Sequence, residues 1–329
     1  MRKKRSIPVF FLFCLCASLF FGQGCGNPAE PESRTDYYFD TVVTLTAYGK
    51  EADAVLEEAF ALCEHYENLF GHTKEGSDIW NINHAGGNPV DVDPETAYLI
   101  SCALECAQKT DGLLDPTVIP LSDLWNFTGD PPGPVPEQAK LDALVSHVGY
   151  ETVLLTGNTV RLADPQAQIG LGFLAKGYIA DQIRALFLER GMEHGLINLG
   201  GNVLAVGEKP DRTPYRVGIQ KPFGARSETV RIIDLADRSL VSSGSYERFF
   251  TEQGVLYHHI LDPATGYPAD TDLDSVTVLS TSSLEGDALS TLCFLLGQKK
   301  GQELIESLPN TEALFVTTDG AVRKTAGFP

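Results

Sequence analysis

The order of the predicted strands and helices is the feature that most limits the fold of this chain. Short runs rich in β-branched and aromatic residues predict strands, and they lie at residues 39–48, 153–155, 159–162, 195–198, 203–206, 215–219, 229–234, 255–260, 275–279 and 313–317. Apolar residues at helical spacing lie at residues 52–70, 94–109, 174–189 and 284–296. Many strands follow one another with no helix between them, whereas a doubly wound parallel sheet needs strict alternation. The sequence therefore predicts an α+β fold of mixed, mainly antiparallel sheets with packed helices.

The N-terminus has the form of an export signal. "MRKKR" supplies a positive start, and the uncharged run over residues 7–21 is shorter than the roughly 20 residues of a membrane span. Cys25 follows this run after small residues, which is typical of a lipoprotein processing site. We expect a signal peptide over residues 1–25 with Cys25 as the candidate lipid-anchored cysteine, a polar tether over residues 26–37 and a single domain over residues 38–329. The protein would then be exported and lipid-anchored to the membrane, facing the periplasm or the extracellular side. An uncleaved anchor and a soluble secreted form are the alternatives.

The charge of the chain and its cysteines limit the kinds of partner. A formal net charge of −19 argues against nucleic-acid binding, which needs a basic surface. Cys102 and Cys106 are four residues apart on a predicted helix, so they could form a metal pair. Small apolar residues on a buried helix face are the simpler interpretation. We therefore expect no nucleic-acid partner and a structural role for these cysteines.

A glycine-rich stretch opens the predicted helix at residues 174–189. Residues 170–177 (GLGFLAKG) satisfy the G-x-G-x-x-A pattern of dinucleotide-binding turns. The polar residues before them and the absence of a preceding β-α-β unit argue against that interpretation. Tight packing of the helix on a sheet, without a ligand, is another alternative. Glycines still allow close approach to the main chain, a helix N-terminus favours phosphate, and Lys176 adds a positive charge there.

Another helix is predicted to begin at Ser282 and to carry two polar residues on one face. Ser282 and Glu285 form a capping box, and Gly297 predicts the end of the helix. Asp287 and Thr291 are four residues apart, so they share one side of the helix. A carboxylate and a hydroxyl offer the hard oxygen ligands that Mg²⁺ prefers. The alternative is the ordinary polar border of an amphipathic helix.

Two adjacent histidines, His258 and His259, lie in the stretch YHHILDPATGYP at residues 257–268. Neighbouring side chains of a strand point to opposite faces. Only one of the two imidazoles can therefore face a given site, and the pattern alone leaves open which one does.

Taken together, these stretches resemble the ApbE family of flavin transferases. The similar stretches follow the order of the family over residues 38–297 and read YFDTVVTLTAYG, SDIWNIN, DGLLDPTVIPLSDLWNF, GLGFLAKGYIAD, INLGGNVLAVG, YRVGIQKP, SSGSYERFF, YHHILDPATGYP, SVTV and GDALSTLCFLLG. Members are exported, often lipid-anchored, Mg²⁺-dependent enzymes. They split FAD, transfer its FMN half to a Ser or Thr hydroxyl of a target protein, and release AMP. The resemblance thus implies a flavin transferase domain over residues 38–329, with FAD as substrate and Mg²⁺ as cofactor.

The resemblance also implies roles for individual residues. The metal ligands of the family fall on Asp287, Thr291 and the main-chain carbonyl of Ala175. A histidine of the pair would act as general base, with His259 preferred over His258 because it directly precedes the matching ILDP. The flavin-binding positions fall on Phe39, Leu113, Leu114, Asp115, Gly172, Tyr178, His259 and Ile260, and Lys176 would add positive charge toward the nucleotide.

Three positions have no clear role in this comparison. Asn83 and Asp181 lie in matching stretches without an assigned function. Gly170 stands where the family usually has the aspartate of Asp-Leu-Gly. A carboxylate near the nucleotide or metal is therefore missing, which bears on the affinity for metal or the number of ions more than on the class of reaction.

Two other functions would keep part of this site. An FAD pyrophosphatase would use water in place of the protein hydroxyl and give FMN and AMP, and a non-catalytic flavin-binding lipoprotein would use the flavin positions alone. The sequence does not identify the acceptor protein. The resemblance suggests a subunit of a membrane-linked redox complex, such as a Na⁺-pumping quinone reductase or an Rnf-type complex, or an extracellular reductase.

Overall fold

The structure, a computed structural model, describes residues 30–329. The predicted signal peptide, Cys25 and the first residues of the predicted tether lie outside the described residues. Within residues 30–329, no helix combines the length and the apolar character needed to cross a membrane.

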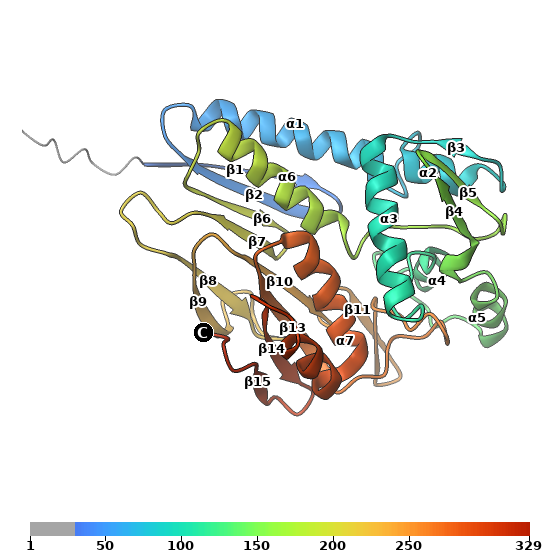
Figure 1. The fold of residues 1–329 in the computed structure, drawn as a ribbon. Coiled ribbons are helices and arrows are strands. Elements are labelled where there is room, and N and C mark those ends of the chain that lie inside the picture. Colours follow the sequence, from blue (N-terminus) through green and yellow to red (C-terminus); the bar gives the residue numbers. More distant parts are fainter. Residues whose placement is uncertain (1–29) are drawn as a thin grey trace, which may run out of the picture.

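An antiparallel sheet of eight strands forms the centre of the molecule (Figure 1). Its strands, in spatial order, are β1 (Pro31–Tyr38), β2 (Thr41–Tyr48), β6 (Gly195–Leu199), β7 (Asn202–Val206), β10 (Ser239–Gly244), β13 (Leu273–Ser280), β14 (Glu312–Thr317) and β15 (Val322–Lys324). β7 and β10 are the least extensively paired neighbours, because only Ser239 and Leu240 of β10 face partners in β7. β10 continues beyond them along β13 as far as Gly244.

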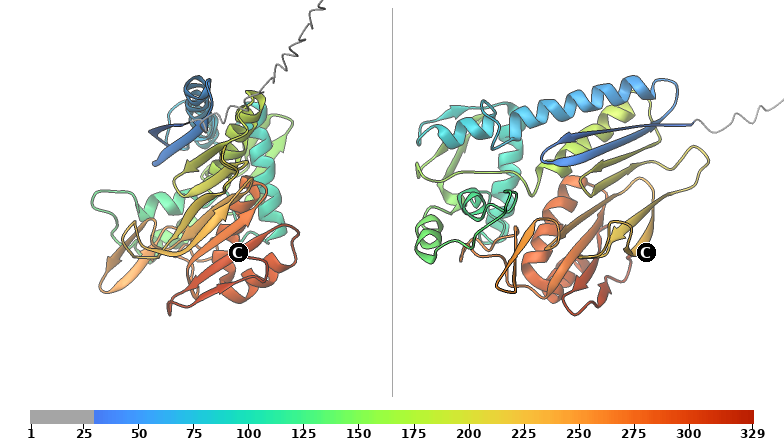
Figure 2. Two further views of the ribbon diagram at one scale, coloured as in Figure 1. Left: turned by 90° about the vertical axis from the view of Figure 1, so that its left-hand side faces the viewer. Right: turned by 180° about the vertical axis from the view of Figure 1, so that it is seen from behind.

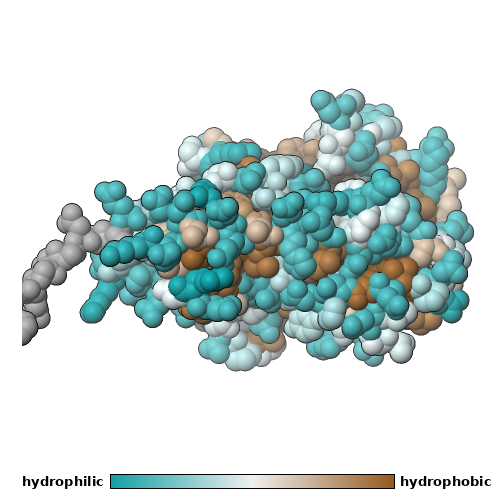
Figure 3. Space-filling model, turned by 90° about the horizontal axis from the view of Figure 1, so that it is seen from above, coloured by the Kyte–Doolittle hydropathy of each residue, from teal (hydrophilic) through white to brown (hydrophobic). Residues whose placement is uncertain are grey.

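Three helices cover one face of this sheet (Figures 1 and 2). α1 (Ala52–Phe70) and α6 (Ala175–Glu189) pack on the half that contains β2 and β6, and α7 (Ser283–Glu306) packs on β10 and β13. The helices bury the apolar face of each amphipathic strand, as the alternation of buried and partly exposed residues along β2 shows. The face seen from above in Figure 3 is mostly hydrophilic, with apolar residues showing between polar side chains.

The hairpin of β8 (Tyr215–Gln220) and β9 (Thr229–Leu235) covers part of the opposite face. Its inward residues Ile219 and Ile233 join a core with Val203 and Leu240 of the large sheet. The middle strands of the large sheet are therefore covered on both faces, by helices on one and by a two-stranded ribbon on the other.

A smaller lobe lies beside the sheet, at the right of Figure 1. It contains α2 (Asp78–His84), α3 (Pro94–Lys109), α4 (Ile119–Trp125), α5 (Gln138–Val145), the short 3₁₀ helix η1 (Tyr150–Thr152), and the small sheet of β3 (Val90–Asp91), β5 (Thr159–Leu162) and β4 (Val153–Thr156). The hairpin of β11 (Phe249–Glu252) and β12 (Val255–His258) joins this lobe, because Phe250 and Tyr257 pack on Trp125.

The predicted fold class is confirmed, and several element boundaries are corrected. The tether prediction is wrong for residues 31–37, which belong to β1. β1 carries no apolar alternation because its side chains are mostly exposed, but its main chain pairs with β2 along its whole length. β10 was not predicted, since three of its six residues are serines. Helix α4 was not predicted either, because prolines interrupt the stretch around it.

Two predicted ends also need correction. The strand predicted over residues 255–260 ends at His258, so His259 and Ile260 follow it. Gly297 breaks the helix as predicted, with φ 78°, but a further helical segment then continues to Glu306.

Candidate active site

The N-termini of α6 and α7 meet beside β10, and the two helices touch at Gly177. A Cβ atom on Gly177 would lie 2.3 Å from the carbonyl oxygen of Ser283 and 2.7 Å from the Cα of Leu284. No side chain fits in that space. The glycine therefore sets how closely the first turns of α6 and α7 approach each other.

Each helix caps the other with a carboxylate. Asp287 of α7 accepts a hydrogen bond of 2.9 Å from the main-chain N–H of Gly177, at the start of α6. Asp181 of α6 accepts hydrogen bonds of 3.0 Å from the N–H groups of Ser283 and Leu284 and from the hydroxyl of Ser282. A helix N-terminus has N–H groups without partners within the helix, so a carboxylate there is favourable. Asp181, whose role the sequence left open, thus fixes the start of the helix that carries Asp287.

Asp287 is a buried carboxylate with one nearby cation. It is 4% exposed, and its Oδ2 lies 3.9 Å from Nζ of Lys176. Burial raises the pKa of Asp287, while Lys176 and the N–H of Gly177 act in the opposite direction. Among residues 30–329, Lys176 is the only cationic side chain within 4 Å of this carboxylate. A further positive charge beside the carboxylate of Asp287 would therefore be stabilising.

Hydroxyl groups gather one turn after Asp287, where Ser290 and Thr291 donate to its main-chain carbonyl at 3.0 and 3.3 Å. Oγ1 of Thr291 lies 3.2 Å from Oγ of Ser243 on β10, and Ser243 also bonds Ser290 at 2.8 Å. Ser243 and Ser290 were not among the site residues predicted from the sequence. The signal available for Ser243 was the stretch SSGSYERFF, where a serine-rich strand leads to charged residues.

The donor set fits a hard divalent cation such as Mg²⁺. It combines a carboxylate, Asp287, with the hydroxyls of Thr291 and Ser243, and Ala175 begins the helix that Asp287 caps. Mg²⁺ is commonly held by one or two carboxylates together with water and phosphate oxygens. Within residues 30–329, no three His, Cys, Asp or Glu side chains gather as a metal site, so a cation here would depend on hydroxyl, main-chain and ligand oxygens.

The loop before α6 is held from the smaller lobe. The side chain of Asn83 donates to the carbonyl of Ile169 at 2.9 Å and accepts from its N–H at 2.8 Å. This gives Asn83 a positioning role. The next residue, Gly170, is buried, and a Cβ there would lie 2.3 Å from Cδ1 of Ile119. Ile119 thus occupies the space that the side chain of an aspartate at position 170 would need, so Ile119 would have to move to admit it.

The two histidines lie in different surroundings. His258 is 5% exposed and its ring packs edge-on against Phe294 of α7, 5.4 Å between ring centres. His259 is partly exposed, and its main-chain N–H donates to the carbonyl of Arg248 at 3.1 Å. Within residues 30–329, Nδ1 of each ring is buried without a hydrogen-bond partner. His258 thus faces the core behind α7, and His259 is the histidine of the pair that remains open to a ligand.

Electrostatics connect His259 to the helix junction. Burial lowers the pKa of His259 to about 3, and the charges of Arg248 and Lys176 lower it further. Burial also lowers the pKa of His258 to about 4. Arg248 donates to the carbonyl of Asp40, in the β1–β2 turn that contains Phe39. The structure therefore brings Phe39, Lys176, His259 and the junction at Asp287 toward one region.

The remaining predicted flavin positions differ in what their side chains can offer. Asp115 is buried and accepts from the N–H and hydroxyl of Thr117 and from the N–H of Tyr150. The hydroxyl of Tyr178 donates to Glu95 at 2.7 Å inside an aromatic cluster. These two side chains already bond other protein groups, so they would stabilise the surroundings of the site and would not bind the flavin through these polar atoms.

The other flavin positions are two leucines, an isoleucine and a glycine. Leu114 and Ile260 are buried in apolar clusters, whereas Leu113 is partly exposed. Gly172 is exposed, with open space where a Cβ would be, and its carbonyl accepts from Lys176. Of these four, Leu113 and Gly172 are the ones a ligand could reach directly.

The fold is α+β, and the junction of α6 and α7 gathers polar and charged groups of several kinds. A buried carboxylate, hydroxyl groups, a lysine and a helix N-terminus are typical of sites that bind phosphate with a hard cation. A sequence model of the ApbE family matches residues 39–315. The chain belongs to the ApbE family.

Individual relatives cover most of the chain. It is 34% identical to the FAD:protein FMN transferase of Treponema pallidum, covering 98% of this chain and 95% of that protein. It is 38% identical to the FAD:protein FMN transferase of Klebsiella pneumoniae, over 84% of this chain and 85% of that protein. The crystal structure of the ApbE protein from Thermotoga maritima is similar with a TM-score of 0.83 and 32% identity, covering 90% of this chain and 97% of that one. The flavin transferase ApbE from Vibrio cholerae is similar with a TM-score of 0.81 and 27% identity, covering 92% and 99%.

Proposed function

We propose that this protein is a Mg²⁺-dependent FAD:protein FMN transferase. It would transfer the FMN half of FAD to a Ser or Thr hydroxyl of an acceptor protein and release AMP. The observation that carries the proposal is the junction of α6 and α7, where the buried carboxylate of Asp287 lies 3.9 Å from Lys176 and the hydroxyl of Thr291, one turn further along α7, contacts Ser243. Relatives over nearly the whole chain have this activity in their names.

The reaction forms one bond and breaks one. The acceptor oxygen bonds to the phosphorus on the riboflavin side of FAD, the bond from that phosphorus to the bridging oxygen breaks, and AMP leaves with the bridging oxygen. In phosphoryl transfer the protein contributes chiefly by positioning the reactants and neutralising their charge. Lys176 and the N-terminus of α6 would supply positive potential to the pyrophosphate.

His259 would take the proton of the acceptor hydroxyl. A general base must be uncharged before it acts, and burial lowers the pKa of His259 so that its imidazole is neutral. The same lowered pKa makes the imidazole a weak proton acceptor, so the negative charge of the bound pyrophosphate would have to raise the pKa of His259 again. His258 would stay behind the strand as a core residue.

Asp287, Thr291 and the carbonyl of Ala175 would hold Mg²⁺, with Ser243 beside them. When bound, the ion would offset negative charge on the pyrophosphate and on the leaving AMP. Burial raises the pKa of Asp287, and a bound cation would offset this effect by stabilising the carboxylate.

We further propose that the protein acts outside the cytoplasm, anchored through a lipid on Cys25. Its acceptor would then be a subunit of a membrane-linked redox complex that presents a hydroxyl on the same side of the membrane. The form of the N-terminal sequence supports this location.

The proposal is tested by incubating the protein with FAD, Mg²⁺ and candidate acceptor domains. Flavin fluorescence that stays on the acceptor in a denaturing gel is the expected result, and Asp287→Ala should lose it while remaining folded. Free FMN and AMP with unlabelled acceptors would instead indicate an FAD pyrophosphatase. Stoichiometric FAD binding without any turnover would indicate a flavin-binding protein.

A further inference from the structure

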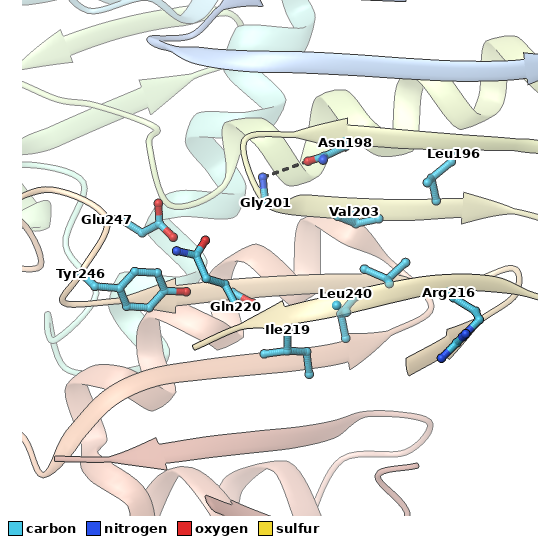
Figure 4. Close-up of a pocket in the computed structure, with 13 residues that line it drawn as sticks. Leu196, Asn198, Gly201, Val203, Arg216, Ile219, Gln220, Leu240, Tyr246 and Glu247 are labelled. Carbon is cyan, nitrogen blue, oxygen red and sulfur yellow. Dashed lines mark hydrogen bonds between the residues drawn. The ribbon is translucent and has the colours of Figure 1, made fainter. Parts of the chain in front are cut away.

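A cavity of about 330 Å³ lies between the β8–β9 hairpin and the large sheet (Figure 4). It is on the sheet face opposite α7, so it is separate from the junction at Asp287. Apolar residues Leu196, Val203 and Leu240 line its middle. Figure 4 shows Gln220, Tyr246 and Glu247 gathered at one end and Arg216 at the other.

Strand β10 is a wall shared by the cavity and the candidate active site. Ser242 lines the cavity, while its neighbour Ser243 bonds Ser290 and Thr291 on the helical side. Consecutive strand residues point to opposite faces. The thickness of one strand therefore separates the cavity from the hydroxyl groups beside Asp287.

The large sheet is incompletely paired at this place. The pairing of β7 with β10 ends at Val203 and Leu240, and the tight turn at Gly200 and Gly201 closes the β6–β7 hairpin just beyond. β10 continues past that turn to Gly244, and Gly201 itself lines the cavity. The edge of β10 that follows Leu240 therefore has no strand of the large sheet beside it on the β7 side. A segment bound in the cavity would therefore lie against Ser242 of β10, one residue from Ser243 on the helical side.

The polar end of the cavity leads to the charged residues of the active site. Glu247, at this end, is next in sequence to Arg248, whose carbonyl accepts the N–H of His259. Burial raises the pKa of Glu247, and the charges of Lys176 and Arg248 act in the opposite direction. The end of the cavity is thus one residue in sequence from Arg248, whose main chain holds His259.

Exposed aromatic rings continue from the same end. Phe223 and Phe249 are 49% and 38% exposed and pack edge-on with ring centres 5.3 Å apart. Phe223 also contacts Tyr246, which lines the cavity. Exposed aromatic groups next to a cavity are typical of surfaces that bind another protein, and they are not needed for a small polar ligand.

We propose that this cavity and the adjoining rings of Phe223 and Phe249 bind the segment of the acceptor protein that carries the modified Ser or Thr. The inference rests on the proposed transferase function. The segment would run along β8 in an extended conformation, with small or apolar side chains over Leu240 and an acidic side chain toward Arg216. Its hydroxyl would reach the phosphorus from beside β10, with FAD held on the helical side. At about 330 Å³ the cavity is at the lower end of the size of ligand pockets, which suits a short run of small residues.

Gln220→Trp fills the polar end of the cavity without touching the junction at Asp287. Ile232→Trp is the matched control, because Ile232 is exposed on the neighbouring strand β9 and does not line the cavity. The probe is an acceptor domain that the wild-type protein labels with FMN. We expect Gln220→Trp to raise KM for this acceptor about tenfold or more, with FAD affinity and acceptor-independent AMP release unchanged. Ile232→Trp should match the wild type in all three measurements.

A second variant removes a ring from the surface. Phe223→Asn suits the left-handed backbone at this position, φ 56°, and should also raise KM for the acceptor without lowering FAD affinity. Transfer by both variants at wild-type efficiency would overturn the inference. A loss of FAD affinity in step with the loss of transfer would also overturn it, because the cavity would then belong to FAD. If the wild type labels no acceptor, the proposed function itself fails, a result that is independent of the variants.

Discussion

Gly177→Ala tests the contact between α6 and α7 on which the candidate site depends. The added Cβ would lie 2.3 Å from the carbonyl oxygen of Ser283, and neither partner is a side chain that can rotate away. Overpacking of this kind costs about 3 kcal/mol at the upper end of its usual range. Replacing a helical glycine by alanine returns about 1 kcal/mol. The two effects together predict a net loss of about 2 kcal/mol in the free energy of unfolding.

Urea unfolding followed by circular dichroism measures this loss, and Gly172→Ala is the control for stability, since a Cβ there meets open space. Separating the helices also moves Asp287 from the N–H of Gly177, so metal-dependent AMP release should fall in the same variant. A Gly177→Ala protein as stable as the wild type or more stable, which helix propensity alone predicts, would refute the close contact.

Three further predictions concern residues around the junction. Asp181→Ala removes the cap of α7 and should lower the free energy of unfolding by about 1–2 kcal/mol, measured by urea unfolding; an unchanged midpoint would contradict the capping role. His258 has a pKa lowered from 6.5 to about 4, so its contribution to stability is complete above pH 6.5 and is lost as the pH falls toward 4, by up to about 1.4 kcal/mol per pH unit. In the His258→Gln variant, the free energy of unfolding should therefore fall less between those pH values than in the wild type. An equal fall in both proteins would contradict this prediction. His259→Ala should slow FMN transfer about 100-fold or more in reactions saturated with FAD, where a weaker hold on the flavin does not limit the rate, and full activity would place the base elsewhere.

The sequence predicted the elements whose residues alternate between core and solvent. The helix at residues 52–70 and the strand at residues 41–48 are recognisable because burial on one face imposes a period. β1 and β10 carry no such period, because β1 is mostly exposed and β10 uses serines to bond α7 and β13. Their positions depend on pairing with strands β2 and β13, which the local sequence of β1 and β10 does not predict.

The candidate site was predictable where it depends on local spacing. Asp287 and Thr291 share a helix face. Ser243 of β10 contacts Thr291 from the sheet. The roles of Asp181 and Asn83 depend on partners 101 and 86 residues away in the chain. The difference between His258 and His259 likewise follows from the packing of Phe294 and the position of Arg248, both set by tertiary structure.

Intact-mass measurement of an acceptor domain, with AMP quantified in the same reaction, tests the proposed function most directly. With FAD and Mg²⁺, we expect an acceptor heavier by one FMN group and one AMP released for each adduct, and neither product with Asp287→Ala. AMP released together with free FMN while the acceptor mass stays unchanged would contradict transfer, and adducts formed at the wild-type rate by Asp287→Ala would contradict the site.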